Sequence, residues 1–165
     1  MTLILRLPYE NLTLEADVPQ PNSAIPVELG APDYPAILEV WRLAGLPVRS
    51  SGRDAPEAFA RQLADGRQRA IGIRDGDRLI AVAVLTHDGR KGWINRLAVD
   101  PAYRRRGVAS ALVAEAERWF RDDVGLEIFA ALIEEENAAS LALFEALGYG
   151  RPRVAYVSKR THPDA

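Results

Sequence analysis

The stretch DPAYRRRGVASALV, from Asp100 to Val113, places three consecutive arginines directly before a glycine and an apolar helical pattern. The first amides of a helix have no partner inside the helix, and the aligned peptide dipoles add about half a positive charge there. Phosphate is a natural ligand of such a helix end. Gly107 has no Cβ to block a close approach, and guanidinium groups pair with phosphate oxygens. The pattern predicts either a site for a pyrophosphate-sized anion or a basic surface loop.

The composition limits the class of protein. The chain has 165 residues, of which 48% are hydrophobic and 27% charged, as in one globular domain. A net charge of −2 argues against a protein that wraps nucleic acid. The sequence has no cysteine and only two histidines, His87 and His162, so we expect no disulfide and no metal. The apolar start MTLILRL is too short for a secretory core or a membrane span, which predicts a cytoplasmic protein.

The elements that must position this loop follow from periodicity and from turn residues. Apolar residues at helical spacing predict helices at 33–47, 55–66, 107–120 and 138–147. Apolar or alternating runs predict strands at 24–30, 69–74, 78–85, 93–99, 126–133 and 153–159. Residues 1–24 form an N-terminal extension that we interpret as a hairpin, residues 25–160 form the domain, and 161–165 are a tail.

The order of these elements predicts where the arginine loop lies. Strand 93–99, helix 107–120 and strand 126–133 have the length of a parallel crossover unit, which is right-handed in nearly all proteins. The loop then follows the carboxyl end of a strand, where open α/β sheets bind ligands. The other strands follow one another through short turns, as in an antiparallel meander. We therefore predict a mixed α/β fold.

Two motifs resemble those of the GNAT superfamily of N-acetyltransferases. Arg104-x-x-Gly107-x-Ala109 resembles motif A of this family, and NAASLALFEALGY, from Asn137 to Tyr149, resembles motif B. The resemblance covers residues 25–160 and leaves 1–24 uncovered. It implies a mostly antiparallel sheet flanked by helices, with a splayed parallel strand pair that forms the cleft for CoA. It also implies acetyl-CoA as the co-substrate.

The family resemblance assigns roles to particular positions. The backbone of the strand before the loop would hold the pantetheine arm of acetyl-CoA at Leu97, Ala98 and Val99. The loop and the first helical turn would wrap the pyrophosphate through Arg104, Arg105, Arg106, Gly107, Val108, Ala109 and Ser110. Asn137 would either reach the pantetheine arm or cap the helix that follows it. Phe144 would pack against the arm.

The residues that would move protons depart from the family pattern. Phe144 stands where many members have a tyrosine as the general acid, and the segment WINRL has no carboxylate where some relatives have a catalytic base. Three side chains remain as catalytic candidates. Asn95 either holds a water or satisfies a neighbouring group, Glu134 either accepts a proton through water or is solvated, and Tyr156 faces either the cleft or the core.

The predicted function is transfer of an acetyl group from acetyl-CoA to a primary amine of a small metabolite or a peptide. In this family the acceptor site involves the first two helices, and Arg42, Arg49 and Arg53 either meet a carboxylate there or are simply exposed. We expect no nucleic-acid partner and no membrane partner, and a homodimer stays open. The alternative function is a non-catalytic sensor or partner module that binds acetyl-CoA or CoA.

Overall fold

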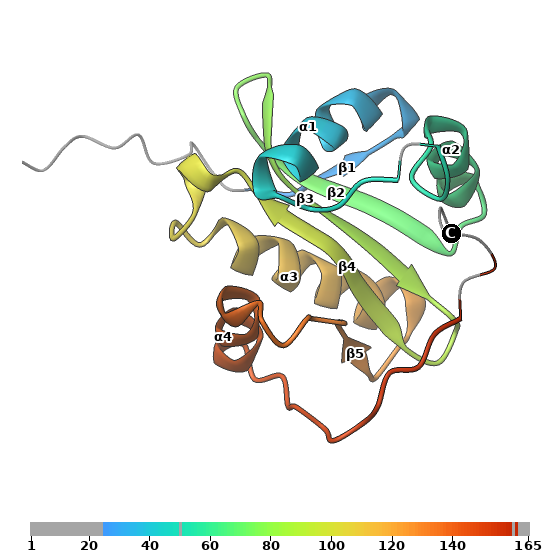
Figure 1. The fold of residues 1–165 in the computed structure, drawn as a ribbon, viewed down its shortest axis with the longest axis vertical. Helices are drawn as coiled ribbons and strands as arrows, with labels where there is room; N and C mark the ends of the chain where they lie inside the picture. Colours follow the sequence, from blue (N-terminus) through green and yellow to red (C-terminus); the bar gives the residue numbers. More distant parts are fainter. Residues whose placement is uncertain (1–24, 50, 160, 162–165) are drawn as a thin grey trace, which may run out of the picture.

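The computed structural model describes residues 25–49, 51–159 and 161, and its centre is a five-stranded sheet (Figure 1). The strands lie side by side in sequence order, and all neighbours are antiparallel except β4 and β5, which are parallel. The strands are β1 (Val27–Leu29), β2 (Gln68–Asp75), β3 (Arg78–His87), β4 (Gly92–Val99) and β5 (Phe129–Ala130). This topology confirms the predicted mixed, mostly antiparallel sheet.

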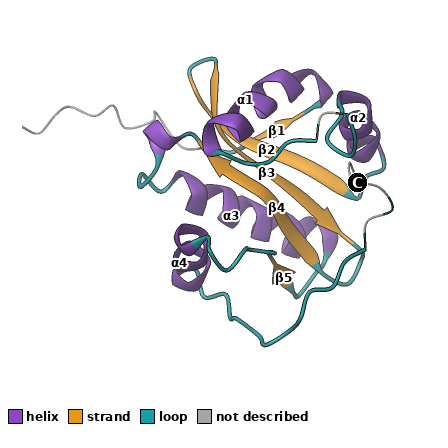
Figure 2. Cartoon of the chain, in the orientation of Figure 1, coloured by secondary structure: helices purple, strands orange, loops and turns teal. Residues whose placement is uncertain are grey.

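Helices cover both faces of the sheet (Figure 2). One face carries α1 (Tyr34–Ala44) and α2 (Pro56–Ala64), and the other carries α3 (Val108–Arg118) and α4 (Ala138–Ala146). Two short 3-10 helices, η1 (Ala31–Asp33) and η2 (Pro101–Tyr103), and one π-helical segment, η3 (Trp119–Val124), complete the helical elements of the described residues. Each face therefore has its own hydrophobic core, one against α1 and α2 and one against α3 and α4.

The helix α3 shows how the sequence pattern produces the second core. Val108, Leu112, Ala116 and Phe120 recur at the spacing of one helical face, and all four are buried. They pack against the apolar side chains of β2 and β3 that point to the same face. The predicted apolar stripe of this helix is confirmed, and its burial fixes the start of α3 next to the end of β4.

The parallel pair β4 and β5 separates soon after it begins. Only Gly92 and Trp93 of β4 pair with β5, although β4 continues to Val99. The rest of β4 therefore has no strand on this side among the described residues, which confirms the predicted splayed parallel pair. The predicted strand at 126–133 is correspondingly short, because only Phe129 and Ala130 have a partner strand.

The predicted strand at 153–159 is wrong. Residues 151–159 form neither helix nor strand, and Val154, Tyr156 and Val157 are 79%, 72% and 86% exposed. An alternating apolar pattern becomes a strand only beside a hydrogen-bonding neighbour. The edge strand β5 is too short to provide one, and this segment runs in an arc away from it (Figure 1).

Some predictions lie outside the described residues. The hairpin in residues 1–24 and most of the tail at 161–165 belong to this group. The domain boundary near residue 25 therefore stays a prediction. Within the ranges that the structure describes, no helix is both long enough and apolar enough to cross a membrane.

Candidate functional site

A β-bulge in β4 shapes the candidate site. Val84 of β3 faces Asn95 and Val82 faces Ala98, so β4 has one extra residue between these two pairs. Arg96 lies at this point with a left-handed φ of 48°, a backbone conformation that costs energy in residues other than glycine. The bulge interrupts the alternation of side chains along β4. Arg96 therefore points to the α1 and α2 side together with Asn95, whereas strict alternation would place it with Ile94 in the opposite core.

The loop between β4 and α3 ends in a conformation that leaves the helix end open. Gly107 precedes α3 with a φ of 76°, and no side chain caps the helix. A Cβ at Gly107 would meet no protein atom within 4 Å, so the space beside the first turn is open. Arg105 is also left-handed, with a φ of 64°. The first amides of α3 have no side-chain cap, which is compatible with the predicted anion site.

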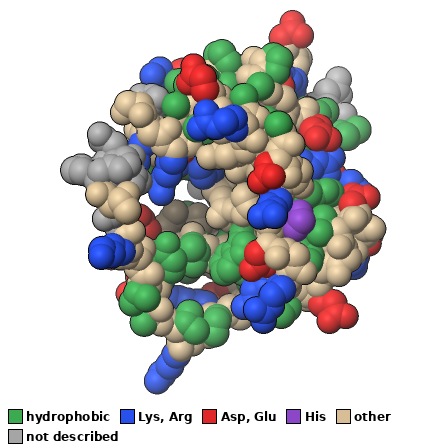
Figure 3. Space-filling view, turned by 90° about the vertical axis from the view of Figure 1, so that its right-hand side faces the viewer, with side chains coloured by type: hydrophobic (Ala, Val, Ile, Leu, Met, Phe, Trp, Pro, Cys, Tyr) green, Lys and Arg blue, Asp and Glu red, His purple; other side chains and the backbone are tan. Residues whose placement is uncertain are grey.

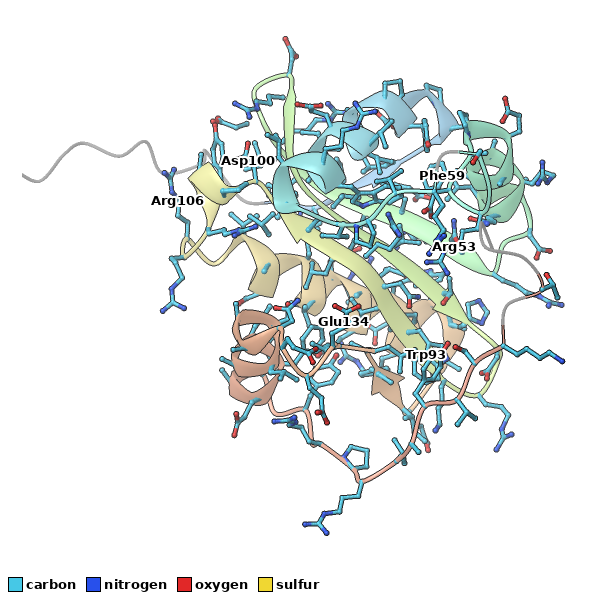
Figure 4. All side chains as sticks on the ribbon, in the orientation of Figure 1. Arg53, Phe59, Trp93, Asp100, Arg106 and Glu134 are labelled. Atoms are coloured by element: carbon cyan, nitrogen blue, oxygen red, sulfur yellow. The ribbon has the colours of Figure 1, made fainter. Side chains whose placement is uncertain are left out.

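The three arginines of the loop lie at its surface. The Arg104 Nε donates to the Val99 carbonyl oxygen at 3.3 Å, and the Arg106 Nη2 donates to the Ala102 carbonyl oxygen at 2.8 Å. Arg106, labelled in Figure 4, also lies over the ring of Tyr103 at 5.1 Å. Arg104 and Arg105 are exposed, so their guanidinium groups are accessible to phosphate oxygens.

The β2–β3 hairpin holds this loop in place. The buried Asp100 accepts a charged hydrogen bond from Arg78, and its other oxygen accepts from the Ala102 amide at 2.9 Å. The Tyr103 hydroxyl donates to the Asp75 carboxylate at 2.7 Å, which raises the pKa of Tyr103 because the bond favours the protonated phenol. The loop is therefore fixed at both ends of the η2 turn.

The helix α4 lies beside α3 and brings the motif B residues to the same side of the sheet. The Asn137 side chain accepts from the Ser140 amide at 3.1 Å, so the capping alternative for this residue is observed. Phe144 is 5% exposed and contacts Tyr149 edge to face, with ring centroids 4.9 Å apart. The Tyr149 hydroxyl donates to Glu117 at 2.8 Å. Burial raises the pKa of Tyr149, and the hydrogen bond to Glu117 raises it further.

A cavity of about 300 Å³ lies on the other side of the β4 bulge, between α1, α2 and the sheet. Its lining includes Trp41, Arg53, Phe59, Asn95 and Arg96. Phe59 belongs to α2 and Arg53 to the loop before it, and both lie on the side of the molecule opposite Arg106 (Figure 4). The face seen in Figure 3 is hollowed, with Lys and Arg side chains at the upper edge of the hollow. Concave sites with a few polar groups are typical of ligand binding.

Arg96 is the residue of this cavity that the sequence analysis missed. Its guanidinium stacks on the Trp41 ring at 4.0 Å, donates to the Pro47 carbonyl oxygen at 3.0 Å and lies 3.5 Å from the Asp54 carboxylate. Desolvation lowers the pKa of Arg96, opposed by Asp54, and the group stays charged at neutral pH. A charged side chain within the mostly apolar strand WINRLAV was the available signal.

The remaining candidates lie apart from one another. The Asn95 Nδ2 donates to the Thr86 Oγ1 at 2.9 Å and to the Trp93 carbonyl oxygen at 3.3 Å, so it satisfies neighbouring groups as one alternative predicted. Glu134 is exposed in the turn before α4 (Figure 4). Tyr156 lies on the exposed C-terminal segment rather than on a strand. Among the described residues, no three His, Asp or Glu side chains are grouped closely enough to hold a metal ion.

Of the three arginines expected near the acceptor, only Arg53 lines the cavity. Arg42 is exposed on α1, and Arg49 contributes its backbone amide, which donates to the Asp54 carboxylate at 2.9 Å. The β4 residues that the resemblance assigns to the pantetheine arm, Leu97, Ala98 and Val99, lie beyond the two β4 residues that pair with β5. The structure therefore places the loop at the carboxyl end of β4 and the cavity beside the bulge in the middle of the strand, joined by the part of β4 that has no β5 partner.

Comparisons with known proteins identify the family. The model of the acetyltransferase (GNAT) family matches residues 35–149, and the chain belongs to this family. N-alpha-acetyltransferase RimI of Mycobacterium tuberculosis is 33% identical over 101 residues, which cover 58% of this chain and 61% of RimI. The PanD regulatory factor of Salmonella typhimurium is 31% identical over 106 residues, which cover 59% of this chain and 77% of that protein.

A solved structure supports the fold. The PaiA N-acetyltransferase of Thermoplasma acidophilum, in complex with coenzyme A, superposes with a TM-score of 0.70 at 16% identity. The superposition covers 79% of this chain and 91% of that one. The chain spans less than two thirds of the length of RimI, so the match describes the shared domain rather than the whole of that relative.

Proposed function

We propose that this protein transfers an acetyl group from acetyl-CoA to a primary amine of a small metabolite or peptide. One observation carries the proposal: the unpaired part of β4 runs from a cavity beside its bulge to the Gly107 loop, where α3 starts without a side-chain cap. The first two features suit the pyrophosphate and the pantetheine arm, and the cavity suits an amine. RimI, a relative by sequence, is named as an N-acetyltransferase.

The residues of the loop fit a bound pyrophosphate. The open space beside Gly107 admits a ligand where any other side chain would stand, and the amides of Val108, Ala109 and Ser110 lie in the first turn of α3. Arg104, Arg105 and Arg106 add positive charge at the same end. Backbone amides, helix dipole and guanidinium groups together favour a multiply charged anion.

The chemistry needs alignment more than acid catalysis. The amine nitrogen bonds to the thioester carbonyl carbon, the C–S bond breaks with its electron pair on sulfur, and the amine proton passes to solvent. A backbone amide beside the β4 bulge polarises the carbonyl oxygen. Phe144 has no proton to donate, but a thiol with a pKa near 8.5 leaves as its thiolate without help. Alignment of the two reactants supplies much of the acceleration.

A second candidate function is a CoA-binding regulatory module without turnover. Two observations favour it: Phe144 occupies the position of the family's proton donor, and a relative by sequence is named as a regulatory factor. Such a module would bind acetyl-CoA at the same loop. It would not release thiol with any amine.

The test is thiol release from acetyl-CoA in the presence of amino acids, polyamines, aminoglycosides and peptides, with the acetylated product identified by mass spectrometry. We expect release with at least one amine, and none from Gly107→Glu, because a carboxylate would fill the phosphate site. Calorimetric titration with CoA accompanies the assay. Binding without release from any amine would favour the regulatory module, and unchanged binding by folded Gly107→Glu would overturn the site.

A further inference from the structure

Two buried N–H groups of residues that line the cavity have no acceptor in the part of the chain that the structure describes. The Trp41 side chain is 1% exposed, and its Nε1 has no hydrogen-bond partner among the described residues. The same holds for the Nε of Arg96, whose guanidinium lies over the Trp41 ring. Both residues line the cavity. Buried polar groups are almost always hydrogen-bonded, and a buried donor without an acceptor is destabilising.

The charge of the cavity points to the chemistry of the missing partner. Its lining holds two arginines, Arg53 and Arg96, and one carboxylate, Asp54, which leaves one net positive charge. The Asp54 carboxylate is already engaged, because one oxygen accepts from the Arg49 amide and faces Arg96. An anion would offset the remaining charge, whereas a polycationic amine would face two guanidinium groups.

The β4 bulge explains why Arg96 lines the cavity. Arg96 occupies the extra position of the bulge and therefore reaches the cavity instead of the opposite core. Its other nitrogens are held by the Pro47 carbonyl oxygen and by Asp54, so the side chain is fixed against the Trp41 ring. Arg96 lies within the part of β4 that has no β5 partner, which begins at Ile94. The donors are thus rigidly held beside the proposed acetyl-CoA cleft.

We propose that the cavity selects amine acceptors that carry a carboxylate, with Trp41 Nε1 and Arg96 Nε as donors to it and Arg53 as an additional charge. The inference rests on the proposed acetyltransferase function and names its substrate class. A cavity of about 300 Å³ suits an acceptor of amino-acid size. The carboxylate comes either from a free amino acid or from an acidic side chain near a peptide amino terminus.

The experiment compares amino acids with their carboxamides, which have the same amine and side chain but no negative charge. We expect kcat/KM for thiol release to be at least roughly tenfold higher for the acids, as for hydrogen bonds to a charged group. Peptide amides with and without an acidic first side chain form a third arm, which separates the two sources of the carboxylate. Equal rates for acids, amides and uncharged peptides would overturn the proposal.

Matched variants assign the effect to the cavity. Trp41→Phe removes the indole N–H and keeps an aromatic ring, and we expect it to reduce the preference for acids about tenfold. Trp119→Phe, in the opposite core, should leave the preference unchanged. Arg96→Lys retains the positive charge but lacks the Nε donor. It provides a second test of the cavity if Trp41→Phe fails to fold. A preference that survives both cavity variants would contradict the assignment.

A binding measurement keeps the inference separate from turnover. The melting temperature of the CoA-saturated protein is followed with added amino acid or amide, because a ligand of the native state raises it. Stabilisation by the acids alone supports the carboxylate site. A lack of thiol release from every amine would then count against the proposed function only. Equal stabilisation by amides, together with active thiol release, would count against the carboxylate site only.

Discussion

Tyr149 packs against Phe144, which stands where many members of the family have a tyrosine as the general acid. The hydroxyl proton of Tyr149 is already engaged in a hydrogen bond. Its hydroxyl donates to Glu117 at 2.8 Å, and its ring lies edge to face against Phe144. The raised pKa of Tyr149 makes loss of this proton unfavourable at neutral pH. A phenol that is hydrogen-bonded to a carboxylate and buried in this way serves the packing of α4 against α3 rather than catalysis.

We predict that Tyr149→Phe lowers the free energy of unfolding at pH 8 by about 1.5 kcal/mol and changes kcat by less than about twofold, because it removes one hydrogen bond to a charged group. Urea denaturation and the thiol-release assay measure the two effects. A collapse of kcat with folding and CoA binding intact would instead identify Tyr149 as the proton donor.

The same substitution has a pH signature. The pKa of Tyr149 is raised in the folded protein above its ordinary value near 10. Its contribution to stability is therefore complete below pH 10 and is lost as the pH rises through the folded pKa. We predict that the difference in unfolding free energy between wild type and Tyr149→Phe shrinks above pH 10. A constant difference from pH 8 to 11 would contradict the assignment.

Some residues of the candidate site could be predicted from the sequence, and others could not. Gly107 was predictable because a glycine before a helix has a recognisable backbone role. Arg96 was not, because its direction depends on a bulge that arises from the pairing of β4 with β3. Strict alternation assigns Arg96 to the wrong face of the sheet. The cavity donors therefore became visible only in three dimensions.

The β2–β3 hairpin holds the loop between β4 and α3 in place. Tyr103 and Asp100 of the loop contact Asp75 and Arg78, which lie at the two ends of the β2–β3 turn. These contacts fix the loop before any ligand binds, which reduces the conformational entropy lost on binding. We infer that the hairpin supports the proposed binding loop through these contacts.

We predict that Tyr103→Phe weakens CoA binding several-fold, because the loop loses its bond to Asp75 and must be ordered by the ligand. Isothermal titration calorimetry measures the change. Tyr149→Phe is the matched control, since it also removes a phenol-carboxylate bond but lies outside the loop. Equal CoA affinities for wild type and Tyr103→Phe would show that the hairpin contact does not organise the site.

At the level of elements, the sequence predicted those whose stability comes from a face they bury. The apolar stripe of α3 needs only the sheet beneath it, and the turn glycines fix the ends of α1 and α4. The segment 153–159 has an equally clear strand pattern but lacks a neighbouring strand in the structure. Because strand formation depends on a partner far along the chain, the pattern alone could not decide it.

At the scale of the whole molecule, β4 connects two halves with different tasks. Its carboxyl end leads into the Gly107 loop and α3 on one face of the sheet, and its bulge turns Arg96 toward α1 and α2 on the other. The proposed cleft for acetyl-CoA and the proposed acceptor cavity therefore share one strand. A reaction between two bound molecules requires that their sites meet in this way.

Amide hydrogen exchange with and without CoA tests this arrangement most directly, because it reports which backbone N–H groups the ligand covers. The central claim is that CoA binds along the unpaired part of β4 and at the start of α3. We predict slower exchange for the amides of Leu97 to Val99 and of Gly107 to Ser110, with little change in α2 and β1. Protection confined to other elements, or none at saturating CoA, would contradict the claim.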